Sequence, residues 1–419
     1  MVPKGWEVKT LEQAKITVTD GDRGKEYPKS SEFFDSGYCL FLSAKNVTKN
    51  GFSFLDTQFI SREKHTKLRK GVVKRGDIVL TTRGSVGQFA YYDHTVNFEN
   101  IRINSGMVTL GCSNSELESD FFYALSKSSL ISRQIDSAAF GSAQPQLTVK
   151  IIKSLKLPVP PLREQQKIAK ILSTWDKAIS TTERLIDNST QQKKALMQQL
   201  LTGKKRLLDE SGERFEGEWE EVLLGSCADL TAGGTPSTKK PEYWGGEIPW
   251  MNSGEVNLKQ VFSVEGRITQ AGLDNSSTKI IPTNSILIAL AGQGKTRGTI
   301  AINRIRLCTN QSIAAIMPHQ DILDHDFLYF NLDGRYEELR AMSTGAGGRG
   351  GLNLSILKSI TLNMPTFKEQ QKIATVLTNA DKEIELLEQQ LADFQQEKKA
   401  LMQVLLTGKK RVVVDGEVA

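Results

Sequence analysis

The stretch KKALMQQLLTGKKR at 193–206 occurs a second time at 398–411 as KKALMQVLLTGKKR, with Gln199 against Val404 as the single difference. Extended backwards at the same offset of 205, the match covers 44 positions without a gap, and 25 of them are identical. A similarity this long indicates duplication. We therefore expect one structural plan to be used twice in the chain.

Each copy has the signals of a long helix. Prolines precede it, in LPVPPL at 157–162 and in NMPTF at 363–367, and a glycine, Gly203 or Gly408, stands near its end. Proline before a helix and glycine after it are the usual start and stop signals. The 40 residues from Arg163 to Thr202 predict a helix about 60 Å long at 1.5 Å per residue.

Apolar residues recur in both copies at alternating intervals of three and four, the spacing of a seam that packs against another helix. The predicted seam residues are Ile168, Leu172, Trp175, Ile179, Ile186, Leu196, Leu200, Ile373, Leu377, Ile384, Leu387, Leu391, Phe394, Leu401 and Leu405. The first copy also places Thr182, Ser189 and Lys193 on the seam, where polar residues select register and partner. We expect the two copies to pack together; the alternative is that each helix folds onto its own domain.

Fainter repeats precede the helices. DFFYAL at 120–125 parallels DFLYFN at 326–331, and GDIVLTTRGSVG at 76–87 parallels NSILIALAGQGKTRG at 284–298. Short β-branched runs broken by glycine-rich turns, with a short helix, predict an α+β fold for each half. The expected order is domain 1–157, helix 158–206, domain 207–362, helix 363–411 and tail 412–419.

Composition is that of an ordinary globular protein, with 39% apolar and 24% charged residues among 419. No run of apolar residues is long enough to span a membrane, and the opening residues lack the apolar core of a signal peptide, so we expect a cytoplasmic protein. The four cysteines lie far apart without a CxxC pair, which argues against a zinc site and against a disulfide framework.

The net charge of +6 is unevenly distributed. The segment 62–75 carries seven basic residues against one acid, and five basic residues without an acid lie between Asp274 and Asp321. Such local positive regions suit phosphate. The alternative is a solvated charged face.

Motifs for catalysis are missing. LAGQGKT at 290–296 resembles the end of a phosphate-binding loop, but the position of its first glycine is an alanine, Ala289. The sequence has no HExxH, no GxSxG and no methyltransferase motif. We therefore expect a chain that binds rather than catalyses and that holds no cofactor or metal of its own.

Amide, hydroxyl and basic side chains recur on glycine-rich turns in both halves, and these types can read base edges or bind phosphate. The candidate DNA-binding residues are Ser43, Lys45, Asn46, Arg83, Ser85, Gln144, Gln146, Trp250, Asn252, Ser253, Lys295, Arg297 and Arg349. For each one the alternative is a plain turn or phosphate contact, and for Trp250 a place in the core.

With these motifs the chain resembles the specificity subunit of bacterial type I restriction-modification enzymes over nearly its full length. The resemblance rests on PVPPLREQQKIA at 158–169, PTFKEQQKIA at 365–374 and the two KKALMQ(Q/V)LLTGKKR endings. GGTPSTKKPEYWGGEIPWMNSGEV at 233–256 is similar to the opening of the family's target recognition domains. The first half departs from that motif, with YPKSSEFFDSGYCLFLSAKNV at 27–47 in its place.

The resemblance implies two target recognition domains, each reading one half of a split sequence in double-stranded DNA, held apart by an antiparallel pair of helices. It also implies partners: two methylation subunits that use S-adenosylmethionine to methylate adenine at N6, and two ATP-driven restriction subunits. Catalysis, S-adenosylmethionine, ATP and Mg²⁺ would then belong to those partners. The competing hypothesis is a coiled-coil scaffold that assembles other proteins without binding DNA.

Overall fold

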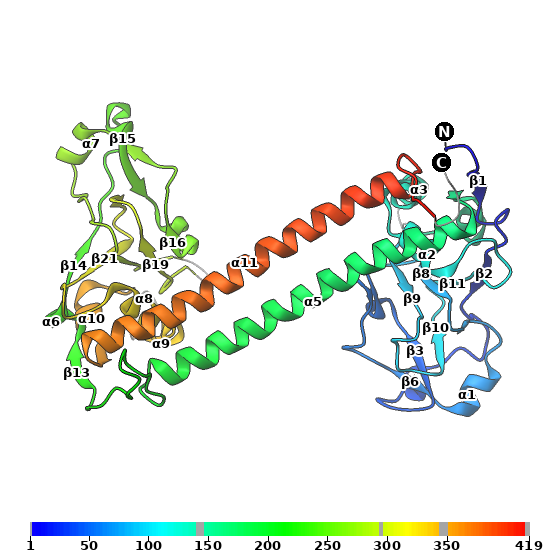
Figure 1. Cartoon of the computed structure of the whole chain (residues 1–419), viewed down its shortest axis with the longest axis horizontal. Coiled ribbons are helices and arrows are strands. Elements are labelled where there is room, and N and C mark those ends of the chain that lie inside the picture. The colour runs from blue at the N-terminus through cyan, green and yellow to red at the C-terminus, as the bar shows by residue number, and fades with distance from the viewer. Residues whose placement is uncertain (1, 140–145, 293–295, 343–350, 415–419) are drawn as a thin grey trace. The chain divides into compact units, whose positions relative to one another are not determined.

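The computed structural model describes residues 2–139, 146–292, 296–342 and 351–414. The chain divides into unit 1 (Met1–Glu183 with Gln390–Ala419) and unit 2 (Arg184–Gln389). Each unit contains one α+β domain and part of each of two long helices, α5 (Leu162–Leu200) and α11 (Phe367–Leu405) (Figure 1). The predicted α+β class, with two similar domains and two long helices, is confirmed.

The domain of unit 1 is built on two four-stranded sheets. The central sheet has the order β2-β11-β8-β9 and is antiparallel, and the second has the order β6-β3-β10-β7, with β3 parallel to β10. β1 pairs with β12, and β4 with β5. The strands are β1 (Glu7–Thr10), β2 (Thr17–Asp20), β3 (Cys39–Leu42), β4 (Val47–Thr48), β5 (Gly51–Phe52), β6 (Phe59–Ile60), β7 (Val72–Val73), β8 (Ile78–Thr81), β9 (Phe89–Tyr91), β10 (Ile101–Ile103), β11 (Met107–Gly111) and β12 (Lys156–Val159). The helices are α1 (Arg62–Lys67), α2 (Ser119–Ser126), α3 (Ser129–Ala139) and α4 (Val149–Ser154).

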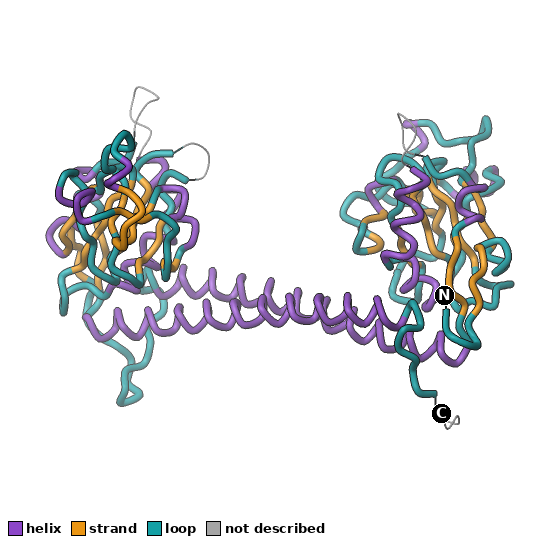
Figure 2. The backbone as a smooth tube through the Cα atoms, turned by 90° about the horizontal axis from the view of Figure 1, so that it is seen from above, coloured by secondary structure: helices purple, strands orange, loops and turns teal. Residues whose placement is uncertain are grey.

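The domain of unit 2 follows the same plan. Its central sheet has the order β14-β21-β18-β19-β16, a smaller sheet has the order β17-β15-β20, and β13 pairs with β22 as β1 does with β12. The strands are β13 (Glu220–Leu223), β14 (Ala228–Ala232), β15 (Trp244–Met251), β16 (Gln260–Val261), β17 (Arg267–Ile268), β18 (Ile286–Ala289), β19 (Ile300–Asn303), β20 (Cys308–Thr309), β21 (Ile313–Pro318) and β22 (Thr361–Met364). The helices are α6 (Leu224–Cys227), α7 (Gln270–Asp274), α8 (His325–Asp333), α9 (Tyr336–Met342) and α10 (Leu354–Lys358). In each domain the strands lie together, with helices and loops around them (Figure 2).

Both long helices lie within the duplicated segments, between the proline and glycine signals seen in the sequence. α5 starts directly after the Pro160–Pro161 pair, and both helices are 39 residues long, about 58 Å at 1.5 Å per residue. Gly203 and Gly408 follow the two helices with φ of +70° and +71°. This left-handed conformation ends a helix and favours glycine, which has no Cβ to clash.

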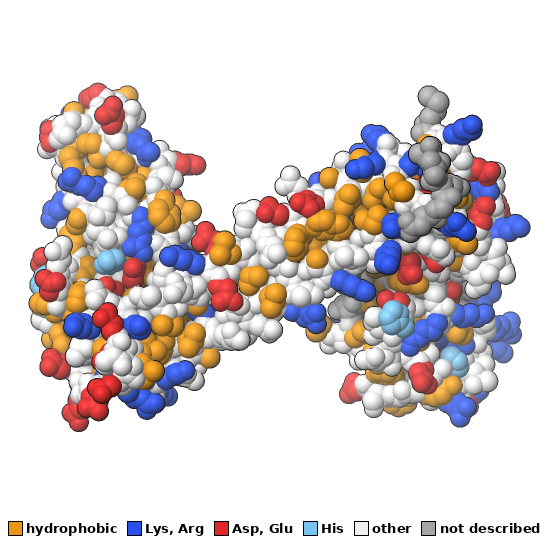
Figure 3. All heavy atoms as spheres, in the orientation of Figure 1, with side chains coloured by type: hydrophobic (Ala, Val, Ile, Leu, Met, Phe, Trp, Pro, Cys, Tyr) orange, Lys and Arg blue, Asp and Glu red, His pale blue; other side chains and the backbone are white. Residues whose placement is uncertain are grey.

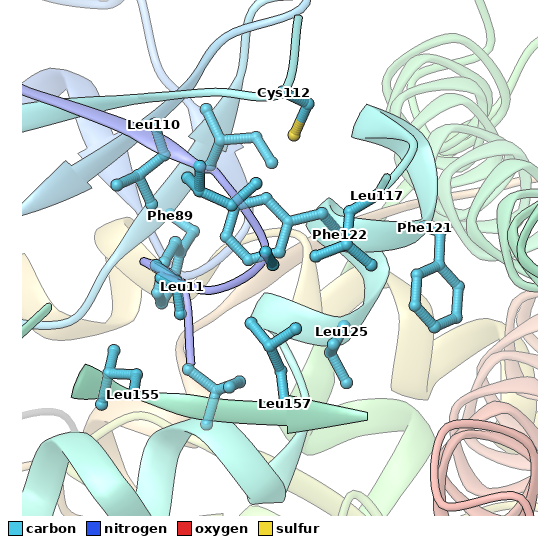
Figure 4. Packing of buried hydrophobic residues seen from close by; sticks show 14 of the residues in the cluster. Leu11, Phe89, Leu110, Cys112, Leu117, Phe121, Phe122, Leu125, Leu155 and Leu157 are labelled. Atoms are coloured by element: carbon cyan, nitrogen blue, oxygen red, sulfur yellow. The ribbon is translucent and has the colours of Figure 1, made fainter. Parts of the chain in front are cut away.

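The ends of the long helices are part of the domain cores. In unit 1, Ile168 and Leu172 of α5 and Leu405 of α11 are buried in one cluster with side chains of the central sheet and α2. Figure 4 shows this cluster, with Phe122 and Leu125 of α2 facing Leu157 of β12. Burying each such side chain stabilises the fold by about 1.5–3 kcal/mol. Each helix end is therefore fixed both to the other helix and to a domain.

Unit 2 repeats this arrangement. Leu200 of α5 and Ile373 and Leu377 of α11 are buried in one cluster with Phe327 and Phe330 of α8. The equivalents of these three helix residues in unit 1 are Leu405, Ile168 and Leu172, at the repeat offset. The duplication therefore extends from the sequence to the core.

Within each unit the two helices run antiparallel, because the beginning of one lies beside the end of the other. In unit 1 the rings of Trp175 and Phe394 meet edge to face with centroids 5.6 Å apart, and Lys398 Nζ lies 2.5 Å from Asp176 Oδ1. In unit 2 the repeat-equivalent pair, Lys193 and Asp381, forms the same ion pair.

The remaining polar seam residues are also accommodated within their units. Ser189 Oγ donates to Glu383 Oε1 at 3.3 Å, and buried Thr182 donates to the carbonyl of Ala178 at 3.0 Å. Polar groups at these positions therefore have partners, as buried or half-buried polar groups require.

The duplicated motifs meet each other at two junctions. At junction 1, in unit 1, Arg411 from the second TGKKR ending binds Glu164 of the first EQQK motif through Nε at 2.7 Å and Nη2 at 2.5 Å. Trp6 Nε1 donates to the same carboxylate at 3.2 Å. Glu164 is almost fully buried in the first turn of α5, where the helix dipole also favours its charge.

Junction 2, in unit 2, is the counterpart. Arg206 from the first ending binds buried Glu369 of the second EQQK motif with two 2.7 Å hydrogen bonds, and its guanidinium lies 6.0 Å from the ring centre of Trp219. Each ending therefore pairs with the motif of the other copy, which explains why both motifs occur twice.

The glutamine after each glutamate also has the same role in both units. Gln165 donates to the carbonyl of Pro160 at 2.9 Å and accepts from the backbone N–H of Glu118 at 2.9 Å. Gln370 donates to Pro365 at 3.0 Å and accepts from the N–H of Asp324 at 2.9 Å. The EQQK motif thus fixes both the proline turn and the start of a domain helix.

No helix among the described residues is long and apolar enough to cross a membrane.

The fold gives a second argument against a phosphate-binding loop at LAGQGKT, because this segment stands between β18 and the antiparallel strand β19. A nucleotide-binding loop would lead into a helix.

Candidate nucleic-acid interface

In unit 1 several turns meet at one end of the central sheet, and they include the predicted DNA-binding residues Arg83, Ser85 and Gln146, whereas Ser43, Lys45 and Asn46 lie elsewhere, after β3. β11 runs antiparallel between β2 and β8, with Val108 opposite Asp20 and Met107 opposite Thr81. The turn after β2, the turn before β11 and the turn after β8 therefore meet. We call these three turns, residues 20–25, 104–106 and 82–88, the loop end of unit 1. It also includes residues 68–71 and 146–147, which pack against the turns.

Arg83 and Ser85 are exposed on the turn after β8. The backbone N–H of Leu147 donates to the carbonyl of Thr82 at 3.1 Å. This bond brings the preceding residue, Gln146, beside Arg83. With its amide oxygen turned towards the guanidinium, Gln146 accepts from Arg83 Nη2 at 2.9 Å and from Nε at 3.2 Å. Arginine has five N–H donors, so a guanidinium held in this way keeps donors for a base or phosphate. Gln144 lies outside the described residues.

The short helix η2 (Ala44–Asn46) follows β3 directly. It contains Lys45 and Asn46, and Ser43 is its N-cap. Asn46 is only 1% exposed, and its amide donates to the carbonyls of Ser53 at 3.0 Å and Asp56 at 2.7 Å. Lys45 is exposed and pairs with the carboxylate of Asp56 at 2.7 Å. The amide of Asn46 thus holds this loop together, and Lys45 is the member of the trio that faces solvent.

Unit 2 has a corresponding loop end. β21 runs antiparallel between β14 and β18, with Ala314 opposite both Ala232 and Ile288. The loop end of unit 2 comprises the described residues 233–240, 277–279, 290–292, 296–299, 309–312 and 351–352. The backbone N–H of Leu352 donates to the carbonyl of Leu290 at 3.1 Å, as Leu147 does to Thr82 in unit 1.

The predicted residues of IPWMNSGEV shape the loop end of unit 2. Trp250 is half-buried; its Nε1 donates to the carbonyl of Gly234 at 3.0 Å, and its ring packs edge to face on Trp244 with centroids 5.0 Å apart. Asn252 is exposed and caps the helix η4 (Ser253–Leu258) by accepting from the N–H of Gly254 at 2.8 Å. Ser253 is the first residue of that helix. Trp250 therefore ties β15 to the glycine turn after β14.

The basic residues predicted for unit 2 have different surroundings. Arg297 is half-buried in the turn before β19, and Lys295 and Arg349 lie outside the described residues. Arg304, part of the positive segment seen in the sequence, binds Asp326 Oδ1 at 2.5 Å and Gln260 Oε1 at 2.7 Å. Its charge is therefore largely neutralised within the domain.

The sequence reasoning missed the turns after β2 and β14. A Cβ on Gly21 would lie 2.0 Å from the carbonyl oxygen of Asn104, and one on Gly233 would lie 2.2 Å from that of Thr309. Only glycine allows this approach, which brings exposed Arg23 into the loop end of unit 1. The signal was a glycine turn after the first strand of each central sheet, in DGDRG at 20–24 and TAGGTP at 231–236.

Two of the buried cysteines have thiols with strongly raised pKa values. Burial raises the pKa of the Cys39 thiol to about 12 and that of Cys112 to about 11, so both stay protonated and unreactive near neutral pH. In the parts of the chain that the structure describes, no group of three or more His, Cys, Asp and Glu residues is placed to hold a metal ion.

Comparison with known proteins agrees with this architecture. The family model of the type I restriction modification DNA specificity domain matches residues 3–188 and again 216–395. The chain is 26% identical over 425 residues to the putative type I restriction enzyme MjaX specificity subunit of Methanocaldococcus jannaschii, covering 98% of this chain and 95% of that one. It is 33% identical over 175 residues to the EcoR124I/EcoR124II specificity subunit of Escherichia coli, covering 40% and 42% of the two chains.

Among solved structures, the S subunit of a type I restriction-modification system from M. genitalium has the same fold. Its TM-score is 0.62 at 16% identity, and the match covers 97% of this chain and 96% of that one. The family match includes both domains and most of both long helices, so the chain belongs to the type I restriction-modification DNA specificity family, whose members are non-catalytic specificity subunits.

Proposed function

We propose that this chain recognises a split sequence in double-stranded DNA, one half per recognition domain, with the two loop ends as the reading surfaces. The observation that carries the proposal is the repeated placement: in both units, turns with basic, amide and hydroxyl side chains gather at the same end of an equivalent sheet. Duplicated surfaces of this kind suit two half-sites. The recognition domains are proposed to be 1–157 and 207–362, and the spacer helices 158–206 and 363–411.

The family implies the partners, and the second duplicated feature supports two copies of one of them. In junctions 1 and 2 an arginine binds a buried glutamate with the same pair of hydrogen bonds, and a tryptophan lies beside each pair. Two equivalent structures suit two copies of one partner, so we propose that each unit recruits one methylation subunit and that two restriction subunits join the assembly. Methylation of adenine and ATP-driven cleavage, with S-adenosylmethionine, ATP and Mg²⁺, would be functions of those partners. A DNA target would suit a cytoplasmic location, which we propose for the assembly.

Salt-dependent DNA binding distinguishes this proposal from a scaffold that never touches DNA. The complex of this chain with its methylation subunits would be titrated with duplex DNA at several salt concentrations. Phosphate contacts release counterions, so affinity should fall steeply as salt rises. A complex that assembles fully but shows no salt-dependent affinity for any duplex would favour the scaffold.

A further inference from the structure

The loop end of unit 1 carries a second feature, four exposed basic residues next to Arg83. They are Arg23, Lys25, Arg69 and Lys70, and we call them the basic edge. Among the described residues, Lys25, Arg69 and Lys70 form no ion pair with an acidic side chain. Figure 3 shows Lys and Arg side chains gathered in the part of unit 1 around α1.

Two segments far apart in sequence supply this edge, and close backbone packing joins them. Gly71 has φ of +87°, and a Cβ there would lie 3.3 Å from the Cα of Gly21 and 3.2 Å from the carbonyl oxygen of Ile103. Arg69 and Lys70 therefore lie beside the turn that carries Arg23. Arg23 Nη2 in turn lies 3.3 Å from the carbonyl oxygen of Ser105.

Asp22 joins the two segments through backbone groups. Its carboxylate accepts from the N–H of Gly24 at 2.9 Å and from the N–H of Arg69 at 2.7 Å. These backbone hydrogen bonds, that of Gly24 first, lower the pKa of Asp22, so it stays ionised. The acid thus stabilises the turn while Lys25, Arg69 and Lys70 stay exposed, and Arg23 also lies 3.4 Å from Asp20 Oδ1.

Buried Arg102 stabilises the backbone of residues 65–70 through hydrogen bonds. It is 4% exposed, and its guanidinium donates to the carbonyls of Lys70 at 2.6 Å, His65 at 2.7 Å and Leu68 at 3.0 Å. Its Nε donates to His65 Nδ1 at 3.1 Å. A buried cation whose partners in these bonds are all neutral retains its positive charge beneath the basic edge. It also fixes the backbone just after α1, where Arg69 and Lys70 begin their turn.

Unit 2 lacks this construction in the part that the structure describes. The loop end of unit 2 also has exposed lysines, Lys239, Lys240 and Lys279, but its described turns are joined by neutral groups. Thr235 Oγ1 lies 2.5 Å from Gln311 Oε1, and Thr278 donates to the carbonyl of Thr309 at 3.2 Å. The half-buried Arg304 there is paired with an acid rather than with carbonyls.

We propose that the basic edge of unit 1 is a preorganised phosphate-binding surface that contacts the DNA backbone beside the first half-site, with Arg102 as its positioning residue. This rests on the proposed function and adds a division of roles. Arg83 with Gln146 faces the bases, whereas the basic edge supplies affinity without reading sequence, as phosphate contacts do.

The test is the double substitution Arg69→Ala with Lys70→Ala, in the complete chain bound to its methylation subunits. Binding is measured against salt on a duplex with the host motif and on one with the first half-site scrambled. Each phosphate contact contributes about 0.9 to the slope of log Kobs against log salt. We expect the slope to fall by about 1 to 2 on both duplexes, with the preference between them unchanged.

The control is Lys153→Ala with Lys156→Ala, which removes the same charge from the same domain. These residues lie towards the opposite end of the central sheet, since the carbonyl of Lys153 accepts from Glu12, ahead of β2. The control should keep the wild-type slope. Arg102→Met should lower the slope as well, if circular dichroism shows that it remains folded.

The measurements distinguish a failure of this inference from a failure of the proposed function. If the wild-type complex binds with a salt-dependent affinity and the Arg69/Lys70 variant keeps its slope, the basic edge is not a phosphate site and the inference is overturned. If the variant loses preference for the first half-site without a change in slope, the edge reads bases instead, which also overturns it. If wild type shows no salt-dependent DNA affinity, it is the proposed function that fails.

Discussion

The two junctions and the two loop ends began as copies of the same plan, yet they have diverged to different extents. At the junctions, Glu164 and Glu369 bind Arg411 and Arg206 with two hydrogen bonds each, and a tryptophan lies beside each pair. At the loop ends, the turns of unit 1 are joined through the charged groups of Asp22 and Arg102, whereas the described turns of unit 2, which also carry exposed lysines, are joined by hydroxyl and amide groups.

The buried junctions and the exposed turns are under different physical constraints. A buried carboxylate must keep its bidentate partner, because losing it leaves an uncompensated charge in the protein interior. An exposed turn has no such constraint, and most surface substitutions change stability by less than about 0.5 kcal/mol. Junctions therefore stay alike while reading surfaces are free to differ, which is what a chain with two different half-sites and two identical partners would need.

The largest expected effect is on the junctions. Arg206→Ala leaves the buried carboxylate of Glu369 without its partner, and removing one partner of a buried ion pair costs about 3–5 kcal/mol. Arg411→Ala, which leaves buried Glu164 unpaired, should cost a similar amount at junction 1, measured by denaturant unfolding of each variant. Glu385→Ala, an exposed position on α11, is the control and should cost less than about 0.5 kcal/mol.

Two results would contradict the equivalence of the junctions. The two junction variants could lose widely different amounts of unfolding free energy, or neither could differ from the control. In the first case the junctions are not energetically equivalent despite their shared bonds. In the second, the ion pairs do not hold the helix ends.

The next largest effect is on recognition. Arg83→Ala should lower affinity for the first half-site by about 1–3 kcal/mol and relax its sequence preference, because a guanidinium that contacts a base edge contributes about that much. Lys295→Ala should act on the second half-site only. Both are measured by competition between duplexes in which one half-site is scrambled. Equal losses at both half-sites for either variant would show that the units do not read independently.

The smallest effect concerns pH and is confined to unit 1. Burial, and then the charge of Arg102, lowers the pKa of His65, whose Nδ1 must be unprotonated to accept from Arg102. Tyr38 also packs edge to face on this ring. A lowered pKa means that the stabilisation is complete above about pH 6.5, the ordinary value, and is lost as pH falls from there through the lowered pKa of the folded state.

Unfolding free energy measured from pH 8 to 5 should therefore fall less steeply in His65→Gln than in wild type. His94→Gln, at an exposed histidine, serves as the control and should behave as wild type. An identical pH dependence in His65→Gln and wild type would show that His65 is not linked to folding.

The helices could be predicted from sequence because their signals are local: prolines before, glycines after and a regular apolar seam between. The pairing of Arg206 with Glu369 could not, since the two residues are 163 positions apart and either ending could in principle meet either motif. The loop ends were harder still. Asn46 has the right chemistry for a base reader, yet its amide faces inward, and only the folded chain shows that Arg23 and Arg69 are neighbours.

The most direct test of the central claim is to delete the gene in its host and map N6-methyladenine across the genome. If each unit reads one half of a split sequence, one motif of two short parts separated by a fixed gap should lose its methylation. It should regain methylation when the chain is restored, and with Arg83→Ala it should regain it with relaxed preference in one part only. A genome in which no split motif changes would contradict the account.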